Sequence, residues 1–104
     1  MLFYVRCHHT ADNCPGFHPE IIGPMMERLA RRDDIAKECG VRLHGYWSAL
    51  PEHSEMMIAE ADTAAAVAMF LSKLFEGVEQ EDIEMTAITP ADELLELGRR
   101  MQPG

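Results

Sequence analysis

Hydrophobic and polar side chains alternate along residues 2–8. One side of this segment carries Phe3, Val5 and Cys7. The other side carries Tyr4, Arg6 and His8. A repeat of two residues is typical of a β-strand with one apolar face. We therefore expect a strand over residues 2–8 whose odd-numbered side chains point into a core.

The spacing of apolar residues changes to a helical one after residue 19. Apolar side chains recur three or four residues apart: Ile22, Met25, Met26, Leu29, Ile35, Ala36 and Cys39. This spacing predicts a helix over residues 19–39 that Gly40 closes. Pro24 should kink or delay its first turns. Residues 10–18 contain turn formers and should be a loop.

The second half of the chain repeats the alternation of strand and helix. Residues 41–48 and 55–61 read as two strands, and the linker between them is short enough for a hairpin. Asp62-Thr63 supplies an N-cap for an alanine-rich helix that runs to about residue 75. A strand over residues 83–88 and an amphipathic helix over residues 91–101 complete the pattern.

The order of these elements predicts an α+β fold of ferredoxin-like, β-α-β-β-α-β topology. Such a chain forms a four-stranded antiparallel sheet in the order 4-1-3-2, with both main helices on one face and here an extra C-terminal helix. The length of 104 residues fits one domain spanning residues 1–104. Met56 and Ile58 would lie on the helix-free face, so we expect a second copy to cover that face in a homodimer.

The net charge of −9 restricts the partners. The chain has eighteen acidic and nine basic residues, and the basic ones form no run. Nucleic acid and anionic membranes should therefore be repelled. The longest apolar run, residues 64–71, is too short to cross a bilayer. The first residues lack the features of a secretion signal, so we expect a cytoplasmic protein with three reduced cysteines.

Three segments carry a resemblance to a known superfamily. They are Tyr4-Val5-Arg6-Cys7-His8-His9-Thr10, Leu50-Pro51-Glu52-His53 and Ala59-Glu60-Ala61-Asp62. Together with the overall pattern they resemble small dimeric ferredoxin-like domains, the dimeric α+β barrels. That superfamily includes muconolactone isomerases, cofactor-free monooxygenases, haem-binding and dye-decolourising relatives, and a nickel-binding branch. Because one fold hosts many chemistries, the resemblance implies a homodimer and no single activity.

Histidine and cysteine gather at one end of the predicted sheet. The first strand is antiparallel to the third, so its end lies level with the hairpin and the first loop. The candidate ligands there are His8, His9, Cys14, His18 and His53, with His44 and Glu60 as alternatives deeper in the sheet. Imidazole and thiolate are the usual ligands of zinc, nickel and copper, so a divalent transition metal is the predicted cofactor. His8 and His9 point to opposite faces and would not both bind one ion unless the strand ends or bulges there.

Two other interpretations stay open. In the expected register the open face collects aromatic and titratable groups: Tyr4, Arg6, His8, Arg42, His44, Tyr46 and Glu60. A cleft there could bind a small aromatic or carboxylate molecule in a cofactor-independent isomerase or monooxygenase. His44 or His8 would be the general base, and Tyr46 would lie on the same face. Alternatively, these groups form only the contacts of a structural or regulatory dimer. The same register places Trp47 on the helix side, although at the end of its strand it could instead line the edge of the cleft. We favour a small-ligand binding protein, most specifically a metal binder.

Overall fold

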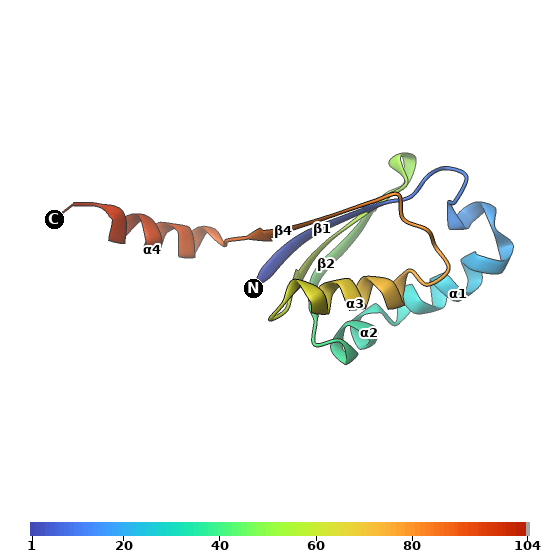
Figure 1. Ribbon diagram of the computed structural model, residues 1–104, viewed down its shortest axis with the longest axis horizontal. Coiled ribbons are helices and arrows are strands. Elements are labelled where there is room, and N and C mark those ends of the chain that lie inside the picture. Colours follow the sequence, from blue (N-terminus) through green and yellow to red (C-terminus); the bar gives the residue numbers. More distant parts are fainter. Residues whose placement is uncertain (104) are drawn as a thin grey trace.

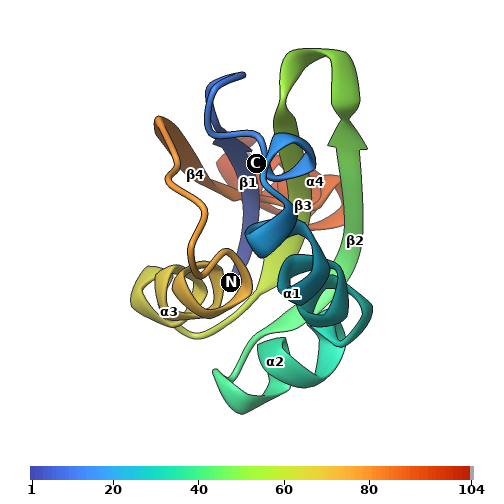
Figure 2. The ribbon, with the colours of Figure 1, turned by 90° about the vertical axis from the view of Figure 1, so that its right-hand side faces the viewer.

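Four antiparallel strands form a sheet that is covered on one face by helices (Figures 1 and 2). The computed structural model describes residues 1–103. The elements follow in the order β1 (Leu2–His8), η1 (Pro15–Phe17), α1 (Pro19–Ala30), α2 (Arg32–Glu38), β2 (Arg42–Ala49), η2 (Leu50–Glu52), β3 (Ser54–Glu60), α3 (Ala64–Leu74), β4 (Asp82–Ile88) and α4 (Ala91–Met101). The strand order β2-β3-β1-β4 confirms the ferredoxin-like α+β fold.

Strand β1 lies at the centre of the sheet and separates its two faces. Val5 and Cys7 have no exposed surface, whereas the even-numbered side chains of β1 are all partly exposed. Val5 pairs with Met57 of β3, and Cys7 pairs with Glu55. The alternation expected from the sequence is therefore confirmed, and the even-numbered residues point to the face that α1, α2 and α3 leave free.

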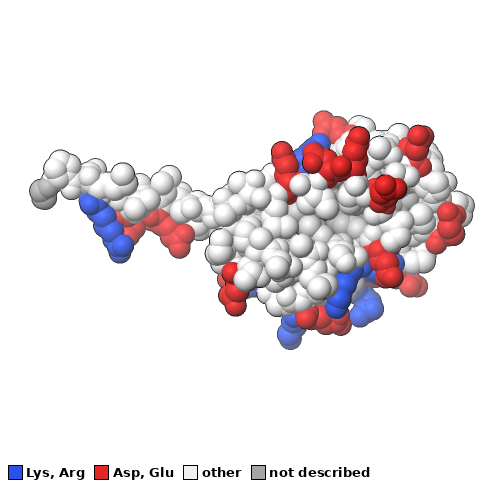
Figure 3. Space-filling model, viewed as in Figure 1, with Lys and Arg blue, Asp and Glu red and all other residues white. Residues whose placement is uncertain are grey.

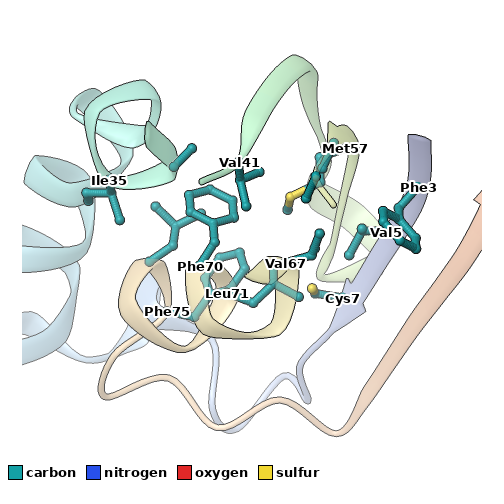
Figure 4. Packing of buried hydrophobic residues seen from close by; sticks show 14 of the residues in the cluster. Phe3, Val5, Cys7, Ile35, Val41, Met57, Val67, Phe70, Leu71 and Phe75 are labelled. Carbon is teal, nitrogen blue, oxygen red and sulfur yellow. The ribbon is translucent and has the colours of Figure 1, made fainter. Parts of the chain in front are cut away.

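Helix α3 supplies most of the side chains that cover the other face. Thr63 caps it by accepting a hydrogen bond on Oγ1 from the Ala66 amide, at 3.2 Å. Its apolar stripe consists of Val67, Phe70, Leu71 and Leu74, all buried. Figure 4 shows Val67, Phe70 and Leu71 on the side of α3 that faces Met57 and the odd-numbered residues of β1. No helix within residues 1–103 is long and apolar enough to cross a membrane.

The prediction of one continuous helix over residues 19–39 is wrong, because the segment forms two helices. It breaks at Arg31, where φ is −102° and ψ is 17°, and Pro24 lies inside α1 without ending it. Both halves contact α3, but their other neighbours differ: α1 lies beside η1, and α2 contacts β2. Arg28 fixes the end of α1 by donating from Nε to the Leu74 carbonyl, at 2.9 Å.

Strand β2 contains a bulge that reverses the expected facing of its second half. Leu43 pairs with Ala59 and Gly45 pairs with Ile58, so His44 is an extra residue without a partner in β3. A slip of one residue moves every later side chain to the opposite face.

Two expectations are corrected by this bulge. Tyr46 pairs with Met57 and packs against the core, so it does not lie on the open face. Trp47 pairs with Met56 on the open face and is 56% exposed, so it does not face the helices. Its indole ring lies over Gly45, where a Cβ atom would overlap it.

Candidate metal centre

Three side chains of the types that bind metal ions meet where β1 ends and the β2–β3 connection turns. One ring nitrogen each from His9 and His53 and the Sγ of Cys14 all lie within 4.8 Å of one another. The three residues come from three segments that are far apart in sequence. The fold of these three segments therefore brings the donor atoms to one place.

The backbone around His9 and His53 fixes the two imidazoles. His9 directly follows β1 and continues its buried side, and its amide donates to the His53 carbonyl at 3.1 Å. The rings meet edge to face, with centroids 5.4 Å apart. His53 ends η2 with φ 52° and ψ 41°, a left-handed conformation that histidine adopts more readily than most residues. This conformation turns the chain into β3 beside His9.

A folded loop places Cys14 over the same end of the sheet. The Cys14 amide donates to the Ala11 carbonyl at 3.3 Å, and the Phe17 amide donates to the Cys14 carbonyl at 3.0 Å. The thiol is free and half-buried. Its neighbour Gly16 leaves space, since a Cβ atom there would be 3.7 Å from Sγ.

His9 is buried without a complete set of hydrogen bonds. It is 5% exposed, and its Nε2 has no hydrogen-bond partner among the described residues. Burial lowers the pKa of His9, and the charges of His53 and His8 lower it further. The ring is therefore held neutral, which is the form that binds metal ions. Buried polar atoms normally have a bonding partner, and a metal ion or a ligand would be such a partner for Nε2 of His9.

A buried carboxylate lies next to the three donors. Glu55 sits opposite Cys7 on the helix side of the sheet and is 9% exposed. Ser48 donates from Oγ to its Oε1 at 3.2 Å. Burial raises the pKa of Glu55 despite the hydrogen bond from Ser48. The Tyr46 hydroxyl is buried without a hydrogen-bond partner among residues 1–103, and burial together with the Glu55 charge raises its pKa.

Glu55 was not among the residues that the sequence singled out. Its register opposite the first strand could be read from the topology, but a carboxylate on the core side of a strand runs against the usual pattern. The bulge at His44 also brings Tyr46 to the helix side of the sheet. The sequence around His44 does not predict this bulge.

The donors line a hollow of about 180 Å³ between η1, α1 and the end of the sheet. Its polar side is formed by His9, Cys14, Ser48, His53 and Glu55. Its other side is apolar and includes Ile22, Met25, Met26 and Leu50. A larger hollow of about 420 Å³ lies between α3 and β4, but none of the candidate ligands lines it.

The remaining candidates lie outside this group, and each contacts an acidic or carbonyl neighbour. His8 is on the opposite face, with Nδ1 3.0 Å from Glu81 Oε2. His18 has Nε2 2.6 Å from the Asp12 carbonyl oxygen. His44, at the bulge, has Nε2 2.8 Å from Glu60 Oε1. Because Tyr46 faces the helices, the pair expected for catalysis on the open face is not brought together.

The fold and site define a ferredoxin-like α+β protein with a group of potential metal ligands. No protein-family model and no curated protein sequence matches the chain. Among solved structures, SCO4226 from Streptomyces coelicolor A3(2) has a similar fold, with a TM-score of 0.53 and 12% identity over 85% of this chain and 99% of that one. An uncharacterized NIPSNAP domain protein from Burkholderia xenovorans aligns with a TM-score of 0.46 and 17% identity, over 86% and 94% of the two chains. At these identities the likeness concerns the fold alone.

Proposed function

We propose that the chain is a small-ligand binding protein whose ligand is a divalent transition metal ion held by His9, Cys14 and His53. The observation that carries this proposal is the convergence of their donor atoms within 4.8 Å. Neighbouring ligands of a tetrahedral zinc ion are ~3.5 Å apart, given bond lengths of ~2.0–2.3 Å. The side chains therefore need to close by about 1 Å, which small rotations about their side-chain bonds can supply.

The ligand chemistry favours zinc, nickel or copper. Two imidazoles and a thiolate are poor ligands for magnesium or calcium, which prefer oxygen. Three protein ligands leave one tetrahedral position open, as in catalytic rather than closed structural zinc sites. The three donors line a hollow that also has apolar lining residues, and Glu55 lines the same hollow. Either Glu55 or a small external molecule would complete the coordination.

The test is metal content and metal affinity of the full chain. We expect protein expressed with these metals to contain about one ion per chain by elemental mass spectrometry. A Co²⁺-loaded sample should show the charge-transfer absorption of a cobalt–thiolate bond, and Cys14→Ser should abolish it. His53→Gly should lose the ion while keeping the left-handed turn, because glycine adopts a positive φ without strain.

Matched histidine variants separate a specific site from general metal affinity. His8→Gln and His18→Gln remove imidazoles that lie outside the group, so both should bind as the wild type does. Wild-type protein that ignores added zinc, nickel and copper would contradict the proposal, and so would equal losses in His18→Gln and His53→Gly.

We also propose that the chain works as a homodimer of the dimeric α+β barrel kind, with the open face at the contact. Two features support this: Ile58 is only partly buried, and Trp47 is 56% exposed on that face. An apolar sheet face without cover is typical of a contact surface. This proposal is independent of the metal.

A further inference from the structure

Helix α4 stands away from the rest of the molecule with its apolar side chains exposed. Figure 1 shows it continuing past the end of β4, beyond the sheet. None of its residues is buried. Its large apolar residues have exposed fractions of 59% for Leu94, 58% for Leu95, 52% for Leu97 and 75% for Met101.

The helix has two distinct sides. At 100° per residue its apolar residues fall on one arc, and its charged residues fall on the other: Asp92, Glu93, Glu96, Arg99 and Arg100. In Figure 3 the charged side chains of α4 lie along its lower edge and its upper edge carries none. The lower side is also where α1, α2 and α3 lie in Figure 1. The apolar stripe of α4 therefore faces the same side as the open face of the sheet.

A helix of this length needs cover from another surface. Isolated helices shorter than ~12–15 residues are marginal in water, and α4 has 11. Its ion pairs, from Glu96 to Arg99 at 3.3 Å and to Arg100 at 3.5 Å, are exposed and contribute little. The stripe of leucines is therefore the main source of stability available to α4, and it acts only when buried.

The open face of the sheet carries a strip of apolar side chains that could pack against the apolar stripe of α4. The strand register places on it Leu2, Tyr4, Trp47, Met56, Ile58 and Ile88. Trp47 is 56% exposed and Ile88 is 37% exposed. The sheet face measures ~23 Å by ~19 Å from strand spacings. An 11-residue helix is ~16 Å long and ~10 Å wide, so it fits within this face.

We propose that α4 of one copy packs on the open sheet face of a second copy, and that the second copy returns the same contact. The helix and the strip lie on the same side of one chain, displaced along the strands. A two-fold axis between them puts each helix on the other chain's sheet, which is the self-complementary arrangement a symmetric dimer requires. Each chain buries both a helix and a sheet patch, which is twice the area of a contact made by one helix alone. Stable interfaces bury ~800 Å² per partner, so the second contact favours a stable dimer.

The charge of α4 argues for a second copy rather than a membrane. Helices that bind membrane surfaces are rich in lysine and arginine on their polar side. Helix α4 carries three acidic residues against two basic ones. The whole chain has a net charge of −9, which also opposes an anionic lipid surface.

The oligomeric state of two neighbouring variants tests the proposal. We expect the wild type to have twice the 11.7 kDa mass of the chain by sedimentation or light scattering. Leu97→Asp puts a charge into the apolar stripe and should raise the dimer dissociation constant ~30-fold or more, the effect of losing an interface hot spot. Glu96→Asp introduces the same residue on the charged side and should leave the dimer unchanged. Because no residue of α4 is buried within one chain, both variants should keep the circular dichroism of the folded body.

A cross-linking experiment identifies the surface that α4 contacts. In a Cys14→Ser, Cys39→Ser background, a chain with Leu97→Cys is mixed with a chain carrying Ile58→Cys and treated with a bis-maleimide. A covalent product containing one chain of each kind is expected, identified by peptide mass spectrometry. Three results would overturn the proposal: a monomeric wild type, a dimer that Leu97→Asp leaves intact while Ile58→Asp dissolves it, or cross-links that never join two chains.

Discussion

The backbone of His53 shows how one residue can serve turn geometry and ligand binding at once. It is the one non-glycine residue with a positive φ in the described part of the chain, at 52°. Strain of this kind costs of order 1–3 kcal/mol at residues that tolerate it poorly. Its position beside His9 and Cys14 explains why a histidine, and not a glycine, would be kept there if the imidazole binds a ligand.

The first prediction separates these two roles of His53. In metal-free protein, His53→Gly should change the free energy of unfolding by less than about 1 kcal/mol, since glycine suits the turn. His53→Val should lower it by about 1–3 kcal/mol, because a β-branched residue at positive φ is strained. Urea unfolding at pH 7 measures both. Equal losses would mean that imidazole contacts, and not the backbone, determine stability here.

A second prediction concerns the pair formed by Glu60 and His44. The hydrogen bond from His44, 2.8 Å long, lowers the pKa of Glu60 below its usual value, and the charges of His44 and Arg42 lower it further. A carboxylate whose pKa is lower in the folded state stabilises the fold above the unfolded pKa. This contribution is lost as the pH falls through the folded pKa.

Removing the imidazole should therefore shift one titration and leave the others alone. We expect His44→Ala to raise the NMR titration midpoint of the Glu60 carboxyl toward that of an ordinary glutamate. His8→Ala, which removes the partner of Glu81 instead, is the control and should leave Glu60 unchanged. An unshifted Glu60 midpoint in His44→Ala would assign the lowered pKa to Arg42.

At the scale of elements, the strands were predictable and their irregularities were not. Every strand begins and ends within one residue of the bounds expected from the sequence. Strands were predictable because apolar residues that alternate with polar ones mark the buried face of a strand. The bulge at His44 and the helix break at Arg31 carry no such signal. A bulge depends on how two strands pair, so the pattern of β2 alone could not show that Tyr46 faces the core.

The third prediction tests which face of α3 supports the sheet. Phe70 has no exposed surface and lies in the core, whereas its neighbour Met69 is 55% exposed. Phe70→Ala should lower the free energy of unfolding by about 3–5 kcal/mol through lost burial and a cavity. Met69→Ala should change it by less than about 0.5 kcal/mol. Urea denaturation with an unchanged slope checks both, and a similar loss in the two variants would contradict the assigned faces.

At the scale of the whole molecule, topology explains why three of the predicted ligands meet. The end of β1 must lie beside the β2–β3 connection in this fold, so His9 and His53 follow from the strand order. The position of Cys14 depends on a loop whose path the sequence does not reveal. His8 was among the predicted ligands, but it lies on the opposite face of the sheet from His9. Glu55 was missed because carboxylates rarely face a core.

The overall dimensions show that the chain has more surface than a compact domain. Its Cα radius of gyration is 16.3 Å, against ~13 Å for a compact chain of about this length. The longest extent, 63 Å, is more than twice the next, 28 Å, because α4 extends past the sheet (Figure 1). Such a shape leaves both the helix and the open face available to a partner.

The last prediction concerns the open face itself. Ile58 lies on it, between Tyr4 of β1 and Gly45 of β2, and is only partly buried within one chain. Ile58→Asp would place a charge among the apolar side chains of the proposed contact, so we expect monomers at micromolar concentration by sedimentation. Because this side chain points away from the helices, the far-ultraviolet circular dichroism should not change. Met69→Asp, on the exposed side of α3, is the control and should remain dimeric; a dimeric Ile58→Asp would exclude this face from the contact.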